Sequence, residues 1–372
     1  MMNSRRKIVA LILGTRPEVI KLFPLIREIR SNDNLQPVII STNQQDRLLR
    51  LALQEFDIVP DYEVSPIKQH SVPAIFSHQV KHLETLILEI QPSMVIVQGD
   101  TTSAIAGAFT AFLCKVPVGH LEAGLRSGNV ERPFPEEIYR QLISRMSQIN
   151  FTPTEKAAEH LILEGIPVER IINVGNTIVD SMRIQLMHVG NLGSKSKEEF
   201  SLLVTLHRRE NFGDNLKQIC LGLRKFSKQF DAVKISLLLH SNPSSREAIT
   251  NFLQDVTGIE LIESVNHRDF LKLMIKADHI LTDSGGIQEE AFLLGKALSV
   301  ARSETERPEV LSEGSQLIDP DEDILFDHLK KMYDEHIKMV NSNNIKIQLK
   351  LDTPFGDGNT STRIVNWIVR NA

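Results

Sequence analysis

Short apolar runs alternate with longer amphipathic segments along most of the chain. The runs are rich in β-branched residues and apolar at consecutive positions, which is typical of strands buried on both faces of a parallel sheet. The segments between them repeat apolar residues at helical spacing. The expected strands are 7–13, 37–41, 94–98, 116–120, 200–205, 233–239, 278–283 and 297–301, and the clearest helices are 17–31, 101–113 and 285–295.

The strand–helix cycle repeats before residue 178 and then begins again. This predicts an α/β fold of two Rossmann-like, doubly wound domains, residues 1–178 and 179–356. The tail carries an apolar stripe at helical spacing, and we expect a helix over residues 357–372 that packs back onto the first domain. The two domains are expected to face a cleft at the carboxyl ends of their strands, where open α/β sheets bind ligands.

Composition, charge and cysteine content limit the class of protein further. A chain of 372 residues with 24% charged residues and a net charge of −5 suits two globular domains and lacks the basic excess expected of a nucleic-acid-binding protein. Cys114 and Cys220 lie in apolar stretches without disulfide or metal-ligand spacing, which fits a reducing cytoplasm. The apolar run after the N-terminal basic residues is short and lacks a cleavage site, so we expect a strand there rather than a signal peptide. No apolar run reaches the length of a membrane span, and we expect a soluble protein without a metal.

Polar residues gather where the predicted strands end. The five clusters are GTRPE (14–18), GDTTSA (99–104), HLEAGLRSGNVERPFPEE (120–137), LHRREN (206–211) and DSGGIQEEA (283–291). The carboxyl ends of parallel strands meet at one edge of a sheet, so these clusters should lie at the ligand-binding edges. The third cluster cannot be a continuous helix, because two glycines and two prolines interrupt it. Its carboxylates therefore belong to a loop.

Each cluster also has an ordinary structural explanation. Asp100 could cap the following helix, the Ser-Gly-Gly at 284–286 could be a simple cap and turn, and a histidine such as His207 is more often structural than catalytic. Glu131 and Glu137 are expected to be loop charge and helix-start charge. The chain lacks the Walker lysine pattern and the Gly-x-Gly-x-x-Gly pattern at these exits, which disfavours ATP-type and NAD-type sites. Five polar clusters at predicted strand exits are better explained together, as a binding site.

The residue types in these clusters suit one kind of chemistry. Arginines and a glycine-rich helix N-terminus bind a diphosphate and stabilise negative charge as it leaves. Carboxylates opposite them would stabilise an oxocarbenium-like sugar and exchange protons. The residues alone therefore indicate an enzyme that acts on a nucleoside-diphosphate sugar at its anomeric bond. Transfer, hydrolysis and epimerisation all remain open at this point.

Motifs in chain order carry a family resemblance. They are GTRPEVIK (14–21), GDTTSA (99–104), HLEAGLRSG (120–128), RPFPEE (132–137), HRREN (207–211), DSGGIQEEA (283–291), ERPE (306–309) and FGDGNTSTRIV (355–365). Together they resemble the non-hydrolysing bacterial UDP-N-acetylglucosamine 2-epimerases over nearly the whole chain. The resemblance implies a fold of the glycosyltransferase-B type, a homodimer, and no nicotinamide cofactor or metal. It also implies interconversion of UDP-GlcNAc and UDP-ManNAc, which supplies ManNAc units for surface polysaccharides.

The family mechanism implies a role for each matching residue. In the family the C1–O bond breaks, UDP leaves, and a base removes the C2 proton to give 2-acetamidoglucal; UDP then adds back while a proton arrives on the other face of C2. Asp100, Glu122 and Glu136 match the acid–base carboxylates, and His207 matches the catalytic histidine near the diphosphate. The matching substrate contacts are Arg16, Ser284, Gly285 and Gly286 for the diphosphate, Glu290 for the ribose, and Arg307 for a further contact.

The chain departs from the family pattern at a few positions. Tyr139 stands where family members usually have Asn, NQQDR (43–47) replaces a sequence like GQH, and the arginine expected near residue 69 is absent. In the family the last two positions help bind a second, activating UDP-GlcNAc. Gln44 and His240 still match that site. We therefore expect activation by UDP-GlcNAc to be weakened or lost.

Several alternatives stay open on sequence grounds. A hydrolysing epimerase would let water capture the intermediate and release ManNAc and UDP, but its known relatives replace GTRPE and HLEAGLR by other sequences. The substrate could be a UDP-HexNAc modified at C4 or C6, which no residue here fixes. A glycosyltransferase would need an acceptor pocket that the carboxylate-rich loop does not suggest. A silent nucleotide-sugar-binding protein would be expected to have lost members of the acid–base set, which is intact here.

Overall fold

The chain divides into two compact units. The computed structural model describes residues 6–44, 46–67, 71–189, 199–206, 208, 211–239, 243–311, 314–340 and 353–372. The N-terminal unit comprises Met1–Ile184 and Leu351–Ala372, and the C-terminal unit comprises Gln185–Lys350. The division therefore falls after residue 184, inside helix α7 (Thr177–Leu186), whereas the sequence suggested a boundary after residue 178.

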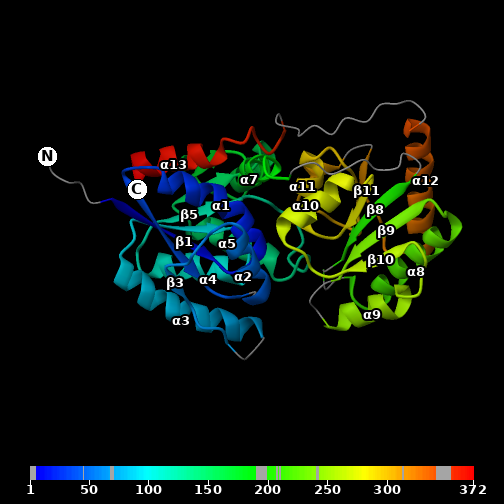
Figure 1. The fold of residues 1–372 in the computed structure, drawn as a ribbon. Helices are drawn as coiled ribbons and strands as arrows, with labels where there is room; N and C mark the ends of the chain where they lie inside the picture. The colour runs from blue at the N-terminus through cyan, green and yellow to red at the C-terminus, as the bar shows by residue number, and fades with distance from the viewer. Residues whose placement is uncertain are drawn as a thin grey trace. The chain divides into compact units, whose positions relative to one another are not determined.

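The N-terminal unit is built around a parallel sheet (Figure 1). Its strand order is β3-β2-β1-β4-β5-β6-β7. Its strands are β1 (Lys7–Leu13), β2 (Leu35–Ser41), β3 (Tyr62–Glu63), β4 (Met94–Gln98), β5 (Val118–Leu121), β6 (Ile149–Thr152) and β7 (Ile171–Asn173). Its helices are α1 (Arg16–Arg30), α2 (Asp46–Glu55), α3 (Val72–Ile90), α4 (Thr102–Leu113), α5 (Glu136–Met146), α6 (Glu155–Leu163), the 3₁₀ turn η1 (Val168–Arg170), the start of α7 and the terminal α13 (Thr360–Asn371).

The C-terminal helix belongs to the N-terminal unit. Helix α13 lies along α1 (Figure 1), and Ile364, Val365 and Ile368 of its apolar stripe are buried. Trp367 meets the ring of Phe151 edge-on, with the ring centroids 5.5 Å apart. The apolar face predicted for the tail is thus buried against the N-terminal unit.

The C-terminal unit repeats the same winding. Its parallel sheet has the order β10-β9-β8-β11-β12-β13. The strands are β8 (Phe200–Thr205), β9 (Val233–Leu238), β10 (Ile259–Ile262), β11 (His279–Thr282), β12 (Ala297–Val300) and β13 (Ser315–Leu317). The helices are α8 (Asp214–Gln229), α9 (Pro243–Leu253), α10 (His267–Lys276), α11 (Gly285–Leu293), the 3₁₀ turn η3 (Pro308–Val310) and α12 (Glu322–Val340). The fold class expected from the sequence is confirmed.

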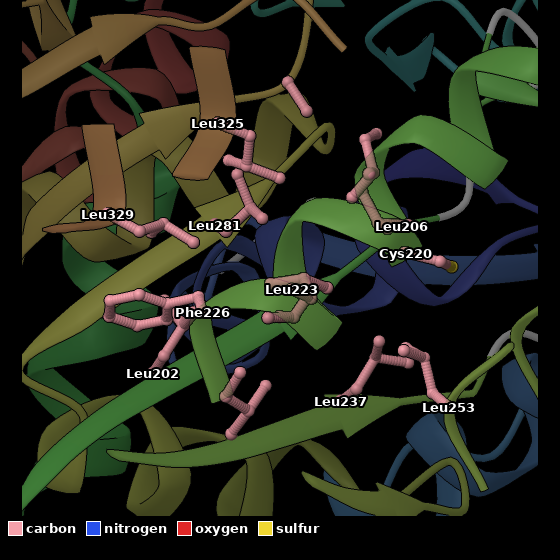
Figure 2. Packing of buried hydrophobic residues seen from close by; sticks show 14 of the residues in the cluster. Leu202, Leu206, Cys220, Leu223, Phe226, Leu237, Leu253, Leu281, Leu325 and Leu329 are labelled. Carbon is pink, nitrogen blue, oxygen red and sulfur yellow. The ribbon is translucent and has the colours of Figure 1, made fainter. Parts of the chain in front are cut away.

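The core of the C-terminal unit shows why the apolar pattern specifies this fold. Alternate residues of β8 and β9, among them Leu202 and Leu237, turn toward α8 and α12 and pack against Leu223, Phe226 and similar side chains (Figure 2). Burying one such side chain contributes about 1.5–3 kcal/mol, so the cluster is the main source of stability in this unit. A comparable cluster in the N-terminal unit joins β1, β2 and β4 to α3 and α4.

All the strands expected from the sequence are confirmed to within a few residues, and so are helices α1, α4 and α11. The pattern missed β3, β6, β7, β10 and β13. These strands are two to four residues long, and polar or charged residues interrupt several of them. A run this short carries too little periodicity to be distinguished from a loop.

The winding creates a switch point in each sheet. The strand order reverses between β1 and β4 in the N-terminal unit and between β8 and β11 in the C-terminal unit. The loops that follow these strands diverge to opposite faces of the sheet, which leaves a ligand-binding crevice in folds of this kind. The loops after β1, β4, β8 and β11 are four of the five polar clusters found in the sequence.

Candidate active site

The exits of β1 and β4 are joined by a buried carboxylate, Glu18. Its Oε2 accepts hydrogen bonds from the amide of Gly14 at 2.9 Å and the hydroxyl of Thr15 at 2.8 Å, while its Oε1 accepts from the hydroxyl of Thr101 at 2.6 Å. Gly14 is required here, because a Cβ at this position would lie 2.0 Å from the Oγ atom of Ser103. Glu18 thus fixes the loop that carries Arg16 against the loop that carries Asp100.

Burial makes the charge of Glu18 sensitive to pH. Desolvation raises the pKa of Glu18 from its ordinary 4.5 to about 7, although hydrogen bonds from Thr101, Gly14 and Thr15 act in the opposite direction. Between these two pH values the folded state binds a proton that the unfolded chain has released. The contribution of Glu18 to the free energy of unfolding therefore falls as the pH rises from about 4.5 to about 7.

We expect this effect to appear in the comparison of wild-type protein with Glu18→Gln. A pKa difference of this size corresponds to about 3 kcal/mol, so the wild type should lose that much stability relative to the variant across the interval. Urea unfolding of both proteins at several pH values between 4.5 and 7.5 measures the difference. A difference that stays constant with pH would show that the Glu18 carboxyl titrates alike in both states.

Glu122 follows β5 and is held in place by two donors. Its Oε2 lies 2.5 Å from the ammonium nitrogen of Lys21 and 2.5 Å from the amide nitrogen of Gln98, and the Lys21 and Glu122 side chains are each only 7% exposed. Glu122 itself has a φ of +63°, in the left-handed region that few non-glycine residues adopt. This backbone conformation is consistent with a side chain held for function, because strained residues concentrate at functional sites.

Asp100 follows β4 and is paired with Arg140 of α5. The guanidinium group of Arg140 donates from Nε at 2.9 Å and from Nη2 to the same carboxylate oxygen, Oδ2. Its Nη1 donates to Glu137 at 3.0 Å. The cap of helix α4 is Thr101, whose hydroxyl accepts from the amide of Ala104, so the capping role considered for Asp100 is taken by its neighbour.

Glu137 corrects one expectation from the sequence. It is fully buried, and its carboxylate accepts from Arg140, from the Ser127 amide at 3.0 Å and from Gln141 at 3.1 Å. It therefore anchors the carboxylate-rich loop to α5, where we had expected only helix-start charge. Glu131 is exposed on the loop, as expected.

His120 supports the same edge from inside the sheet. The ring is fully buried, and its Nε2 lies 2.8 Å from the Gly99 carbonyl, directly before Asp100. Desolvation lowers the pKa of His120 to about 4, so the ring is neutral at pH 7. A neutral ring that donates its Nε2–H to the Gly99 carbonyl holds the backbone directly before Asp100.

The remaining predicted residues of the N-terminal unit lie at the same edge. Glu136 is the first residue of α5, and Arg16 is the first residue of α1. Tyr139 lies near Thr102 and Glu136, and burial raises the pKa of its phenol. Gln44 accepts from the amide and the hydroxyl of Ser103, at 2.9 and 2.7 Å, which ties the exit of β2 to the start of α4.

In the C-terminal unit, the exit of β11 leads directly into a helix. Ser284 is the N-cap of α11 without a side-chain capping bond, and Gly285 and Gly286 form its first turn. A Cβ on Gly285 would lie 2.4 Å from Nη1 of Arg307, whereas a Cβ on Gly286 would meet no heavy atom within 4 Å. The first glycine is therefore needed for packing, and the second leaves its amide open to an approaching anion.

The exits of β8 and β11 are joined by Asp283. Its Oδ2 accepts from the backbone amide of Arg208 and from the side chain of Asn211, both at 2.9 Å. This fixes Arg208 and Asn211 against the start of α11. His207, the predicted catalytic histidine, lies outside the described residues, and so does His240 of the proposed activating site.

Arg307 lies in a buried charge network. Its guanidinium donates to Glu289 and to Glu306, both at 2.5 Å, and Glu306 also accepts from Arg302 at 2.9 Å. Arg208 approaches Glu306 at 3.6 Å. Three arginines and two buried carboxylates thus form one network of charged groups, and Arg307 of this network lies against the first turn of α11.

Glu290, the predicted ribose contact, lies one turn further along α11. It is 5% exposed, and its Oε1 lies 2.8 Å from Nε2 of His267. No group of three or more His, Cys, Asp or Glu side chains among the described residues is arranged to hold a metal ion.

Comparison with known proteins identifies the family. A family model described as UDP-N-acetylglucosamine 2-epimerase matches residues 27–369. The chain belongs to this family. The UDP-N-acetylglucosamine 2-epimerase of Neisseria meningitidis serogroup A is 35% identical to it over 98% of this chain and 99% of that protein. The crystal structure of UDP-GlcNAc 2-epimerase from Neisseria meningitidis bound to UDP-GlcNAc matches with a TM-score of 0.90 at 34% identity, covering 98% of this chain and 100% of the other.

A more distant solved structure shows which fold type this epimerase has. MurG from Acinetobacter baumannii matches with a TM-score of 0.56 at 14% identity, over 98% of this chain and 99% of the other, and therefore shares the fold alone. The architecture is the glycosyltransferase-B type, as expected. None of the helices in the described ranges is both long and apolar enough to cross a bilayer.

Lys21, Arg140 and His267 of this epimerase hold predicted site residues in place but were not predicted from the sequence. Lys21 and Arg140 had a recognisable signal. Lys21 stands at a buried position of α1, and Arg140 follows Glu136 at the i+4 spacing that places two side chains on one helix face. A charged residue on the apolar face of a helix is unusual without a buried partner, and that partner was the missing information.

Proposed function

We propose that the enzyme is a non-hydrolysing UDP-GlcNAc 2-epimerase that interconverts UDP-GlcNAc and UDP-ManNAc. The observation that carries this proposal is the pairing of carboxylates with cations on adjacent strand exits. Glu122 is held by Lys21 after β5, and Asp100 by Arg140 after β4. Two oriented carboxylates at one sheet edge suit a reaction that moves protons on both faces of one carbon.

The proposed reaction proceeds by elimination and re-addition. The C2 proton of the sugar is not acidic, because C2 has no neighbouring carbonyl. As a carboxylate takes this proton, the C2–H electrons form a C1=C2 bond and the C1–O electrons leave with UDP, giving 2-acetamidoglucal. In the return step UDP oxygen bonds to C1 and a second acid delivers a proton to the opposite face of C2. Asp100, Glu122 and Glu136 are the proposed acid–base groups. The two steps as written consume no oxidant, reductant or cofactor.

The proposed role of the C-terminal unit is to hold UDP. The amides of Gly285 and Gly286 with the Ser284 hydroxyl would bind the diphosphate at the helix N-terminus, where the helix dipole stabilises negative charge. His207 and Arg307 are the further proposed contacts from this unit, and Arg16 is the proposed diphosphate contact from the N-terminal unit. Arg307 already donates to Glu289 and Glu306. We therefore propose that it acts through the position of the α11 turn as well as through its charge.

Proton NMR in D2O tests this function. Incubation with UDP-GlcNAc is expected to produce UDP-ManNAc with deuterium at C2 and little free UDP, because the C2 proton exchanges with solvent at the glucal stage. Accumulation of free ManNAc and UDP would replace the proposal with the hydrolysing reaction. A spectrum that does not change would point to a UDP-HexNAc with a modified C4 or C6.

We also propose that activation by UDP-GlcNAc is weakened here. The β2 exit departs from the family pattern, and Gln44 Oε1 is already used by Ser103. The initial rate of the reverse reaction, from UDP-ManNAc, should therefore change less than about twofold when a trace of UDP-GlcNAc is added. A strong dependence on added UDP-GlcNAc would contradict this expectation.

We also propose a use for the product, a cellular location and an oligomeric state. UDP-ManNAc would supply ManNAc units for surface polysaccharides. A cytoplasmic location is supported by Cys114 and Cys220, which are both free thiols. A homodimer is supported by the exposed Leu88, Phe112 and Leu113 on the neighbouring helices α3 and α4, since exposed apolar side chains of this size favour an interface.

A further inference from the structure

A buried histidine connects the proposed ribose contact to the end of α7. His267 is the first residue of α10 and is 1% exposed. Its Nε2 lies 2.8 Å from Oε1 of Glu290, and its Nδ1 lies 2.6 Å from Oε1 of Gln185. Both of these oxygens are acceptors, so the ring donates to both of them only as the doubly protonated imidazolium. In that form three side chains from the separate helices α7, α10 and α11 make one hydrogen-bonded chain inside the C-terminal unit.

This chain restricts the carboxylate of Glu290. A glutamate side chain has three rotatable bonds, and holding it in one conformation costs free energy. Here the imidazole contacts one carboxylate oxygen, Oε1, at 2.8 Å, and this contact restricts the conformations open to the side chain. Rotation of the His267 ring is restricted, because Gln185 contacts its other nitrogen. The ring centroid of Phe270 lies 6.3 Å from that of His267.

We propose that His267 is a positioning residue for ribose recognition. It holds the Glu290 carboxylate in the orientation that accepts hydrogen bonds from the ribose hydroxyls of UDP. The inference rests on the proposed role of Glu290 as the ribose contact. It goes beyond that role, because it assigns part of the selectivity for a ribonucleotide to a residue that does not touch the nucleotide. A residue that holds a ligand-contacting side chain in one conformation makes the geometry of that contact more precise.

The proposal predicts a loss that is specific to the ribose hydroxyls. In His267→Leu, which removes both ring nitrogens, the affinity for UDP should fall by about tenfold, as expected for a weakened hydrogen bond to a charged group. The affinity for 2′,3′-dideoxy-UDP, which has no hydroxyls to present, should stay within about twofold. The KM for UDP-GlcNAc should rise by a factor similar to the loss of UDP affinity while kcat stays nearly unchanged, because the lost contact is the same in the ground and transition states.

Calorimetric titration of UDP and dideoxy-UDP tests this with four proteins: wild type, His267→Leu, His267→Gln and Glu290→Gln. His267→Gln keeps an N–H donor near Glu290 and should retain most of the preference for UDP. His267→Gln also serves as the second variant should His267→Leu fail to fold. Gln185→Leu leaves the imidazole in place without its partner at Nδ1. This variant should lower the preference for UDP over dideoxy-UDP by about threefold.

The outcomes separate the inference from the proposed function. An unchanged preference for UDP in His267→Leu, or an equal loss of affinity for both ligands, would overturn the positioning role. An unchanged preference in Glu290→Gln would instead show that Glu290 is not the ribose contact, and the proposed site would then need another residue. Loss of the preference in Glu290→Gln and His267→Leu, with recovery in His267→Gln, is the result expected here.

Discussion

Replacing Glu122 by glutamine or Asp100 by asparagine is expected to lower kcat by about a thousandfold or more, within the range seen when general acid–base groups are removed. Both substitutions keep the size of the side chain and remove its charge and its ability to exchange a proton, together with the ionic partner of Lys21 or Arg140. The dissociation constant for UDP should change by less than about threefold, because the proposed UDP contacts lie mainly on the C-terminal unit. Coupled assays of turnover and calorimetric titration of UDP measure the two quantities.

A control for these variants lies in the same loop. Glu131 is an exposed carboxylate of the 120–137 segment, and Glu131→Gln should leave both kcat and UDP affinity unchanged. Turnover within tenfold of wild type in Glu122→Gln would exclude this carboxylate as an acid or base. A matching loss of UDP affinity would instead assign Glu122 to binding.

The second large effect is expected at Arg140. Its side chain is 4% exposed and its guanidinium group serves Asp100 and the fully buried Glu137 together. Arg140→Met removes the cation and leaves Glu137 as a buried carboxylate without its ionic partner, which costs about 3–5 kcal/mol. We expect a loss of unfolding free energy of this size. Turnover should fall as well, but no further than in Asp100→Asn, because the Asp100 carboxylate is still present and is only no longer oriented. Urea unfolding and the turnover assay measure the two effects.

An exposed arginine provides the comparison. Arg246 pairs with Glu263 on the surface, where the two side chains are 43% and 68% exposed. Arg246→Met should leave the free energy of unfolding nearly unchanged, because an exposed ion pair is screened by water. Similar losses for Arg140→Met and Arg246→Met would mean that the Glu137 carboxylate finds other donors in the variant.

The positions of the strand exits could be predicted from the sequence, because an apolar run on both faces of a strand ends where polar residues begin. Arg16, Asp100 and Ser284 were found in this way, as polar residues within three positions of the ends of β1, β4 and β11. The short strands β3 and β7 were not found, because two or three residues carry no periodic signal. Their places in the sheet depend on pairing with longer neighbours.

The partners of the site residues could not be predicted in the same way. Glu18 and Thr101 are separated by 83 positions, and Lys21 and Glu122 by 101. Only the parallel crossovers of the sheet bring such positions together. The sequence therefore indicated which carboxylates lie at the active edge but did not indicate which cation holds each of them.

The sequence by itself determined the α/β class, the repeated winding and the residue types at each strand exit, since these follow from local periodicity and turn chemistry. The tertiary structure decided which side chains are buried and paired. Glu137 became an anchor, the pKa of Glu18 rose to about 7, and His267 came to lie against Glu290. These properties depend on desolvation and on hydrogen bonds between distant segments, and both arise only when the helices close over the sheet.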